Sequence, residues 1–250
     1  CRLPALSNLL HFLVHSGSHA YTFTYGIPRV FSDRPLHDEA FVRKKVGAMS
    51  HNLKLSLCLN LILLGFILTG YVGPSVKTTF MPDVEAPVIG NHTRIHPLGI
   101  VIGSVTLGDR VFVAPAASVR GEEGRHIHIG NESNVQDGVV VHGLETFEGD
   151  HELPENEVEV DGMKYSVYIG NRVSLAHQSQ VHGPARVGND TFIGMQALVF
   201  RAEVGDRVIV EPGAKIIGVK VPSGRYVPAL SVVTTQDVAD NLPLITERYP

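Results

Sequence analysis

The most regular feature of the chain is an aliphatic residue at every sixth position between residues 169 and 199. A spacing of six fits neither the 3.6-residue period of a helix nor the alternation of one long strand. It is typical of a parallel β-helix, in which each hexad supplies one short strand and one corner. The hexads of this segment start at Ile169, Leu175, Val181, Val187, Ile193 and Val199.

The same pattern extends over most of the chain in four stretches. These are residues 89–119, 129–141, 169–199 and, after a shift of one residue, 204–216. Segment 120–128 and a strongly acidic segment, 145–166, interrupt them. Three hexads complete one coil of a three-faced solenoid, so residues three hexads apart should stack on one face. Frequent Gly, Asn and Asp residues suit corners with positive φ. We therefore expect an all-β solenoid at residues 89–230.

The two ends of the chain differ from the repeat. Residues 1–48 show no period and are assigned no fold, being either an N-terminal extension or sequence translated upstream of Met49. At residues 49–73, Lys54 precedes an apolar run and then small residues, which predicts a signal peptide or an uncleaved anchor. A linker at 74–88 follows, and a C-terminal helix begins within 231–250.

This N-terminal pattern predicts a location outside the cytoplasm. The protein would be secreted, periplasmic or held at the cell surface, with a mature start between about Gly70 and Ser75. Contact with a membrane is expected only if the apolar segment stays uncleaved, because that run is short of the roughly 20 residues that a span requires.

Composition narrows the possible partners and metal ligands. The formal net charge is −4, and the Lys and Arg residues form no stripe, so we expect a small soluble substrate and no nucleic acid. The two cysteines, Cys1 and Cys58, lie far apart and outside the repeat. They provide neither a disulfide framework nor a thiolate zinc site, so any metal must be held by histidine and carboxylate groups.

The phase of the repeat predicts where three histidines lie relative to one another. His142 and His182 each follow the first residue of a hexad and should stack one strand spacing apart, whereas His177 faces around a corner. A closed trimer would bring His177 of one subunit to the other two histidines of its neighbour. Three neutral imidazoles with an open position are a catalytic zinc ligand set, which lowers the pKa of bound water to about 7.

Further polar residues should surround these histidines. On the face of His142 the repeat places Arg120, Glu122 and Glu123. Glu145 follows three residues after His142, where the acidic segment begins, so one carboxylate beside metal-bound water and another on a mobile loop could relay a proton. Gln136 and Asp137 lie between, where they could orient ligands or pair with Arg120.

Four segments resemble the gamma-class carbonic anhydrases, most closely the subgroup with an acidic proton-shuttle loop. They are SVRGEEG (118–124), NVQDGVVVHGLE (134–145), residues 158–200 and GRYVPA (224–229). The likeness covers about residues 80–245. It implies a left-handed parallel β-helix with a C-terminal helix, assembled as a homotrimer. It also implies reversible hydration of carbon dioxide to bicarbonate and a proton.

The resemblance implies a role for each site residue. The metal ligands would be His142, His177 and His182, and the catalytic residues Glu122, Glu123, Gln136 and Glu145. Among these, Glu123 would lie beside metal-bound water and Glu145 would be the proton shuttle, while Arg120 and Asp137 would form an interface ion pair. The metal would be zinc, with Fe²⁺ or Co²⁺ as alternatives, and no organic cofactor is expected. Gly121 and Gly143 replace slightly larger residues, which predicts a roomier site.

Two other functions are compatible with the hexapeptide architecture. An acyltransferase generally uses a single catalytic histidine and an acyl-CoA groove between subunits, and it predicts no metal. A noncatalytic β-helix scaffold can keep the three histidines but lacks the carboxylates. The presence of Glu123, Glu145 and the long acidic segment favours the enzyme over the scaffold. Fold alone does not separate these functions.

Overall fold

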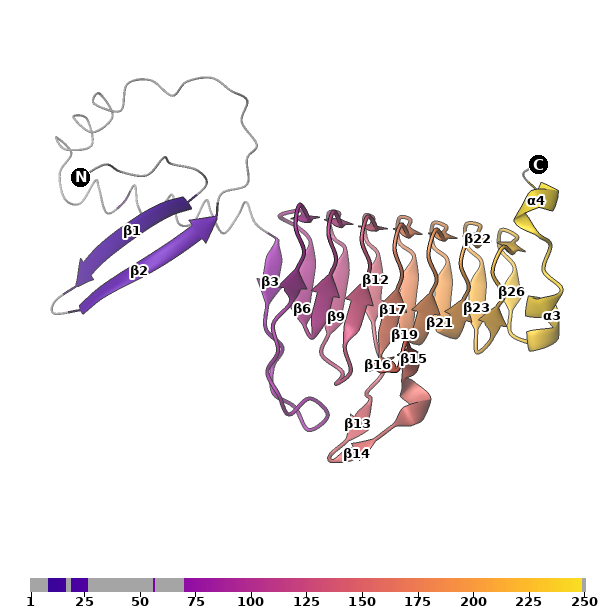
Figure 1. The fold of residues 1–250 in the computed structure, drawn as a ribbon, viewed down its shortest axis with the longest axis horizontal. Coiled ribbons are helices and arrows are strands. Elements are labelled where there is room, and N and C mark those ends of the chain that lie inside the picture. Colours follow the sequence, from indigo (N-terminus) through magenta and orange to yellow (C-terminus); the bar gives the residue numbers. More distant parts are fainter. Residues whose placement is uncertain (1–8, 17–18, 27–55, 57–69, 249–250) are drawn as a thin grey trace, which may run out of the picture. The chain divides into compact units, whose positions relative to one another are not determined.

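The computed structural model describes residues 9–16, 19–26, 56 and 70–248. The chain divides into two units, Cys1–Leu59 and Asn60–Pro250. In the first unit, strands β1 (Leu9–Ser16) and β2 (His19–Gly26) pair antiparallel (Figure 1), in a region for which the sequence predicts no fold. The expected signal peptide, residues 49–73, lies outside the described residues except for Ser56 and residues 70–73.

The second unit is a left-handed parallel β-helix whose short strands stack on three faces (Figure 1). The first face contains β4 (Val88–Ile89), β7 (Val105–Leu107), β10 (Ile127–Ile129), β17 (Val167–Ile169) and β24 (Lys220–Val221). The second contains β5 (Arg94–Ile95), β8 (Phe112–Val113), β11 (Asn134–Val135), β18 (Ser174–Leu175), β20 (Phe192–Ile193), β22 (Ile209–Val210) and β25 (Tyr226–Val227). The third contains β3 (Tyr71–Gly73), β6 (Ile100–Gly103), β9 (Ser118–Gly121), β12 (Val140–His142), β23 (Lys215–Ile217) and β26 (Val232–Val233). Strands β19 (Gln180–Val187) and β21 (Leu198–Val204) turn from the third face onto the first.

The pairing of strands confirms the predicted repeat phase. Val101 pairs with Val119, three hexads later, as expected for one coil. Val141 pairs with Val119 on one side and with Val181 on the other, so the stacking continues across both interruptions. Because a strand's side-chain alternation fixes which residues face inward, this register determines the positions of every outward-facing residue on the third face.

The core of the solenoid is formed by two inward positions in each hexad. The predicted hexad starts from Val101 to Ile216 are at most 1% exposed, as is Val111, which lies two residues before the next hexad start. Val or Ala occupies most of these second positions, which the sixfold pattern alone does not indicate. Ile89 is 38% exposed, because its strand, β4, pairs on one side only, with β7.

The solenoid extends beyond the predicted bounds of 89–230 at both ends. Strand β3 lies within the expected leader, and β26 lies past residue 230. Ser75 and Met81 are buried, so the expected linker at 74–88 packs against the solenoid. The predicted C-terminal helix is present as α3 (Gln236–Asp240), followed by α4 (Ile245–Arg248). Within the described part of the chain, none of the helices combines the length and apolar character needed to span a membrane.

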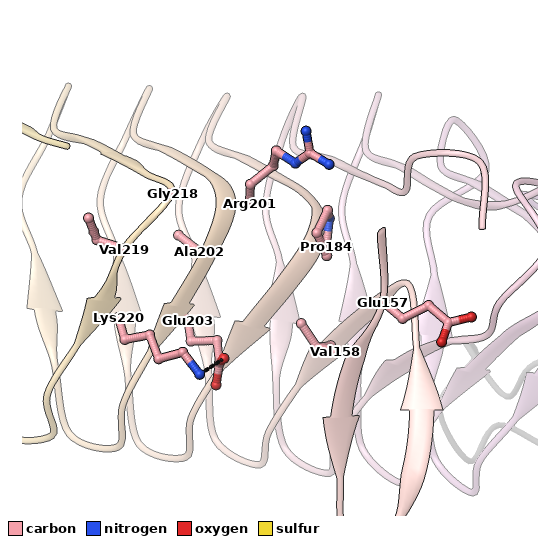
Figure 2. Close-up of a pocket in the computed structure, with 9 residues that line it drawn as sticks. All are labelled: Glu157, Val158, Pro184, Arg201, Ala202, Glu203, Gly218, Val219 and Lys220. Carbon is pink, nitrogen blue, oxygen red and sulfur yellow. Dashed lines mark ion pairs between the residues drawn. The ribbon is translucent and has the colours of Figure 1, made fainter. Parts of the chain in front are cut away.

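One corner, between the third and first faces, carries the long insertions, and we call it the loop corner. Residues 74–87, 122–126 and 143–166 all leave the solenoid there. The acidic loop, 143–166, contains β13 (Phe147–Glu148), β14 (His151–Glu152), η1 (Pro154–Asn156), β15 (Val158–Val160) and β16 (Met163–Tyr165). A pocket of about 150 Å³ lies beside residues 157–158 of this loop, lined by Glu157, Pro184, Arg201 and Lys220 among others (Figure 2).

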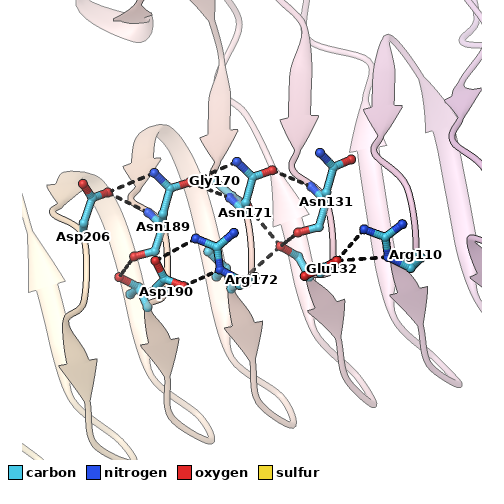
Figure 3. Close-up of polar contacts among 12 residues, drawn as sticks. Arg110, Asn131, Glu132, Gly170, Asn171, Arg172, Asn189, Asp190 and Asp206 are labelled. Atoms are coloured by element: carbon cyan, nitrogen blue, oxygen red, sulfur yellow. Dashed lines mark hydrogen bonds and ion pairs between the residues drawn. The ribbon is translucent and has the colours of Figure 1, made fainter.

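The corner between the first and second faces is regular, and we call it the asparagine corner (Figure 3). Six successive coils place an Asn or Asp there, and the backbone N–H of each of the first five donates to the side-chain oxygen of the corresponding residue in the next coil, at 2.7 or 2.8 Å. The N–H of the sixth, Asp206, donates to Ser223 Oγ at 3.0 Å. The residues of this ladder are Asn91, Asp109, Asn131, Asn171, Asn189 and Asp206. The side chains thus satisfy backbone donors at a turn, where strand pairing does not reach them.

Positive φ explains only part of the preference for Asn and Asp at this corner. Positive φ occurs at the residue that follows each ladder position, for example 56° at Arg110 and 54° at Arg172. The ladder residues themselves act as hydrogen-bond acceptors. Backbone bonds between coils, such as Arg172 N–H to the Asn131 carbonyl at 2.8 Å, hold these unusual conformations.

Candidate active site

His142 and His182 lie side by side on the third face. Strands β12 and β19 pair these two residues directly, as the repeat phase predicts, and their ring centroids are 5.3 Å apart. Nδ1 of His182 lies 3.3 Å from the Gly183 carbonyl, to which it can donate a hydrogen bond. Burial lowers the pKa of His182 below its ordinary value, which favours the neutral imidazole that binds metals.

Charged residues gather around His142, also as predicted. Glu123 Oε1 and an Arg120 guanidinium nitrogen each lie 3.2 Å from His142 Nε2. Arg120 Nε donates to Glu122 Oε2 at 2.7 Å. The side chains of Glu123 and His142 are only 18% and 17% exposed, so their interaction is partly shielded from water. This arrangement places a carboxylate and a guanidinium at the edge of the histidine pair.

Glu145 is joined to Glu123 through one buried residue, Thr146. Both the backbone N–H and the hydroxyl of Thr146 donate to the Glu123 carbonyl, each at 2.9 Å. Thr146 is fully buried, whereas Glu145 is exposed at the start of the acidic loop. The repeat phase predicts nothing about Thr146, because the residue lies inside an insertion. The structure therefore couples the two carboxylate-bearing segments more directly than the sequence indicates.

His177 lies at the corner between the second and third faces, apart from the histidine pair. Its Nδ1 is 2.9 Å from Asp137 Oδ2, and both side chains are more than half exposed, at 55% and 54%. Gln136, which precedes Asp137, donates to Asn134 Oδ1 at 3.0 Å. Within the described residues of one chain, no group of three His, Cys, Asp or Glu residues could hold a metal ion. Arg120 and Asp137 likewise find different partners within the chain, so their mutual pairing stays a prediction.

The chemistry of the donors fits a metal ligand set. Nδ1–H of His177 can donate to Asp137 Oδ2, and Nδ1–H of His182 can donate to the Gly183 carbonyl. Nε2 of each of these two rings is then available to bind a metal. Metal-binding histidines commonly have one ring nitrogen oriented by a carboxylate or carbonyl in this way. His177 and His182 would therefore each supply one nitrogen ligand if two subunits met along these surfaces, and His142 would supply a third in place of its present Nε2 contacts with Glu123 and Arg120.

The predicted extra room at the site is not present at Gly143. A Cβ added to Gly143 would lie 2.9 Å from Ser166 Cβ and 3.1 Å from Ser166 Oγ. Ser166, at the other end of the acidic loop, donates to the Arg125 carbonyl and is itself buried. The small residue at 143 thus permits close packing of the two ends of the loop and does not enlarge the site.

Comparison with known proteins identifies the family. The chain is 56% identical over 173 residues to a carbonic anhydrase from Methanosarcina thermophila, a match that covers 69% of this chain and 70% of the relative. The chain belongs to the gamma-class carbonic anhydrases. Members of this enzyme family interconvert carbon dioxide and bicarbonate, as the resemblance of the four segments implies.

Two other similarities of the chain are weaker in sequence identity. The chain is 45% identical over 149 residues to a carboxysome assembly protein from Nostoc, covering 60% of this chain and 25% of that protein. A solved hexapeptide transferase family protein from Anaplasma phagocytophilum aligns with a TM-score of 0.49 and 22% identity, covering 72% of this chain and 98% of the other. No protein-family profile matches the chain.

Proposed function

We propose that this carbonic anhydrase hydrates carbon dioxide at metal sites shared between the subunits of a homotrimer. The observation that carries the proposal is the division of the ligands into two surfaces. His142 and His182 form a pair on the third face, while His177, oriented by Asp137, lies around the corner. A head-to-tail contact repeated around a threefold axis would join the two surfaces three times and close the assembly.

Each surface would bring different groups to the shared site. When bound, a zinc ion would supply a water molecule whose pKa is lowered to about 7, with Fe²⁺ or Co²⁺ as alternatives. Glu123, next to His142, would accept the proton released during hydration. Glu145 is exposed to solvent, yet it lies only two residues along the chain from Gly143, the buried residue that follows His142. It would therefore pass the proton from the site to buffer. Arg120, held by Glu122, would place positive charge near the bicarbonate product.

Metal content and subunit number provide the first test of the proposal. The full chain should bind one metal ion per subunit, sediment as a trimer and lose hydration activity on chelation. Readdition of zinc should restore activity, and anaerobic purification should reveal whether iron is retained instead. Active protein that contains no metal, or a monomer that retains full activity, would exclude shared metal sites.

Two substitutions test the division of roles between the carboxylates. Glu145→Ala should lower kcat in dilute buffer, change kcat/KM little and recover with imidazole, because only proton export is impaired. Glu123→Ala should depress both constants, because its carboxylate acts in the hydration step. Rescue of both variants by imidazole to the same extent, or of neither, would contradict these roles.

We also propose that residues 49–73 direct export of the enzyme. Lys54, the apolar run after it and the small residues near Gly70 occur in the order of a signal peptide. A cut after Gly70 would keep β3, which pairs with β6 through Tyr71, Val72 and Gly73. N-terminal sequencing of the exported protein would locate the cut. Recovery of cytoplasmic protein that retains residues 1–70 would refute export.

A further inference from the structure

The backbone at Glu145 is anchored to the solenoid through two side chains. The Asn156 amide nitrogen donates to the Glu145 carbonyl at 2.7 Å. The Asn156 amide oxygen in turn accepts from an Arg201 guanidinium nitrogen at 2.6 Å. Arg201 belongs to β21, the strand next to β19, so the connection runs from the regular part of the fold through η1 of the acidic loop to residue 145.

Within the described part of the chain, the guanidinium of Arg201 binds a neutral amide and not a carboxylate. Figure 2 shows Arg201 extending outward from its strand near Pro184, while Lys220 and Glu203 pair with each other, at 2.7 Å. Among residues 70–248, no carboxylate lies within ion-pairing distance of Arg201, whose guanidinium donates instead to the amide of Asn156. A charge-assisted bond to a neutral amide orients that amide strongly, leaving its N–H₂ group directed at the Glu145 carbonyl.

The residue after Glu145 is fixed from the opposite side. Thr146 is fully buried and donates twice to the Glu123 carbonyl. Arg125 adds a second clamp on the loop through Glu157 at 2.7 Å and Glu152 at 2.8 Å. The carboxylate of Glu145 makes no hydrogen bond or ion pair with the described residues. Glu145 thus combines a fixed backbone with a free side chain.

We propose that Asn156, oriented by Arg201, is the positioning residue that keeps the Glu145 carboxylate within reach of the site. This inference rests on the proposed role of Glu145 in proton export. Proton transfer requires donor and acceptor to approach to hydrogen-bond distance or to share one bridging water. Rotation of the side chain about a fixed backbone position meets this requirement in every turnover, so export does not depend on movement of the acidic loop.

Substitutions at Asn156 separate positioning from simple support of the loop. Asn156→Asp keeps an acceptor for Arg201 but loses the donor to the Glu145 carbonyl, and Asn156→Ala loses both. Both variants should lower kcat about threefold to tenfold in dilute buffer, leave kcat/KM unchanged and recover with imidazole. If Asn156 only supports the loop, Asn156→Asp should behave as the wild type does, which would overturn the proposal.

Arg201 supplies a second test because it acts through Asn156. Arg201→Ala should cause a smaller loss of kcat, Arg201→Lys should recover part of it, and Arg201→Ala combined with Asn156→Ala should be no worse than Asn156→Ala alone. Arg172→Ala is the matched control, since Arg172 is an exposed arginine that pairs with Asp190 at the asparagine corner. It changes the net charge equally and should leave kcat unchanged.

Glu145→Ala, measured in parallel, distinguishes two kinds of failure. If Glu145→Ala shows no buffer-dependent loss of kcat, the proposed proton route itself is wrong. If Glu145→Ala shows that loss while both Asn156 variants keep wild-type kcat, the proton route stands and the positioning role of Asn156 is overturned. Multiplicative losses in the double variant of Asn156 and Arg201 would likewise contradict their action as one unit.

Discussion

The asparagine corner and the loop corner belong to the same coils but obey different rules. At the asparagine corner, each coil turns with the same short segment, and one side-chain oxygen per coil accepts from the backbone of the preceding coil. At the loop corner, the connection is Ser104 alone between β6 and β7, residues 122–126 in the next coil and residues 143–166 in the one after that. The candidate active-site carboxylates lie at this second corner.

The difference shows how a repetitive fold accommodates chemistry. A ladder that passes from one coil to the next requires a side-chain acceptor at the same place in every coil, so it holds the register and leaves no room for insertions. A corner without that requirement can vary in length while the paired strands on either side keep their register. Glu122, Glu123 and Glu145 are all carried by such insertions. Stability and chemistry should therefore be separable by substitution.

The largest effect should come from the histidines. His142→Ala and His177→Ala should each abolish hydration activity, because each would remove one ligand from every shared site of the proposed trimer. The free energy of unfolding of the metal-free protein should change by no more than about 1 kcal/mol, because neither residue lies in the aliphatic core. Thermal unfolding after chelation and a hydration assay measure the two properties.

Mixing the two variants sharpens this result. Co-expression should restore part of the activity, because an intact His142 and His182 pair on one subunit can meet an intact His177 on its neighbour. Tagged subunits show whether mixed trimers form. Mixed trimers that stay inactive would contradict the shared site, and a large loss of stability in either variant would contradict the separation of stability from chemistry.

Insertions should distinguish the two corners by their effect on folding. A Gly-Ser pair inserted after Gly149, which lies in the turn between β13 and β14 with φ of 60°, should cost at most about 0.5 kcal/mol. The same pair inserted after Asn171 should cost at least about 3 kcal/mol, because it displaces ladder bonds and the strand β18 that follows. Denaturant unfolding measures both, and equal costs would contradict the comparison.

A single ladder position should give a smaller effect. Asn171→Ala leaves the Asn131 N–H without its acceptor and should destabilise the protein by about 1–2 kcal/mol. Asn171→Asp keeps an acceptor oxygen, as Asp109 and Asp206 do at equivalent positions, and should cost little. Thermal unfolding of the two variants tests this contrast. The ladder would not be the source of stability if both changes had the same effect.

The smallest effect concerns the exposed ion pairs beside the ladder. The hydrogen bond from Arg172 lowers the pKa of Asp190 below its ordinary value of 3.8, so this pair stabilises the fold above that pH and loses its effect as the pH falls through the lowered value. Arg172→Ala should therefore be slightly less stable than the wild type at pH 7, and the two should converge in acid. Urea unfolding at several pH values measures the difference, which would instead persist in acid if another contact were responsible.

The repeat pattern by itself determined most of the architecture. Because each hexad has the same inward positions, counting along the chain correctly paired Val119 with Val141 and Val141 with Val181, even across two insertions. The stacking of His142 on His182 followed from the same count. A strict period allows such inference because the position of a residue in the coil is set locally, by strand alternation and corner length.

Tertiary structure alone decided how the insertions are held. Thr146, Asn156 and Arg201 have no place in the predicted site, and the bond between Asn156 and Arg201 joins residues 45 positions apart. The extension of the solenoid to β3 and the burial of Met81 were also not evident, because the segments involved lack the sixfold pattern. In an irregular loop, partners are chosen by which side chains meet in space, and no period along the chain records that meeting.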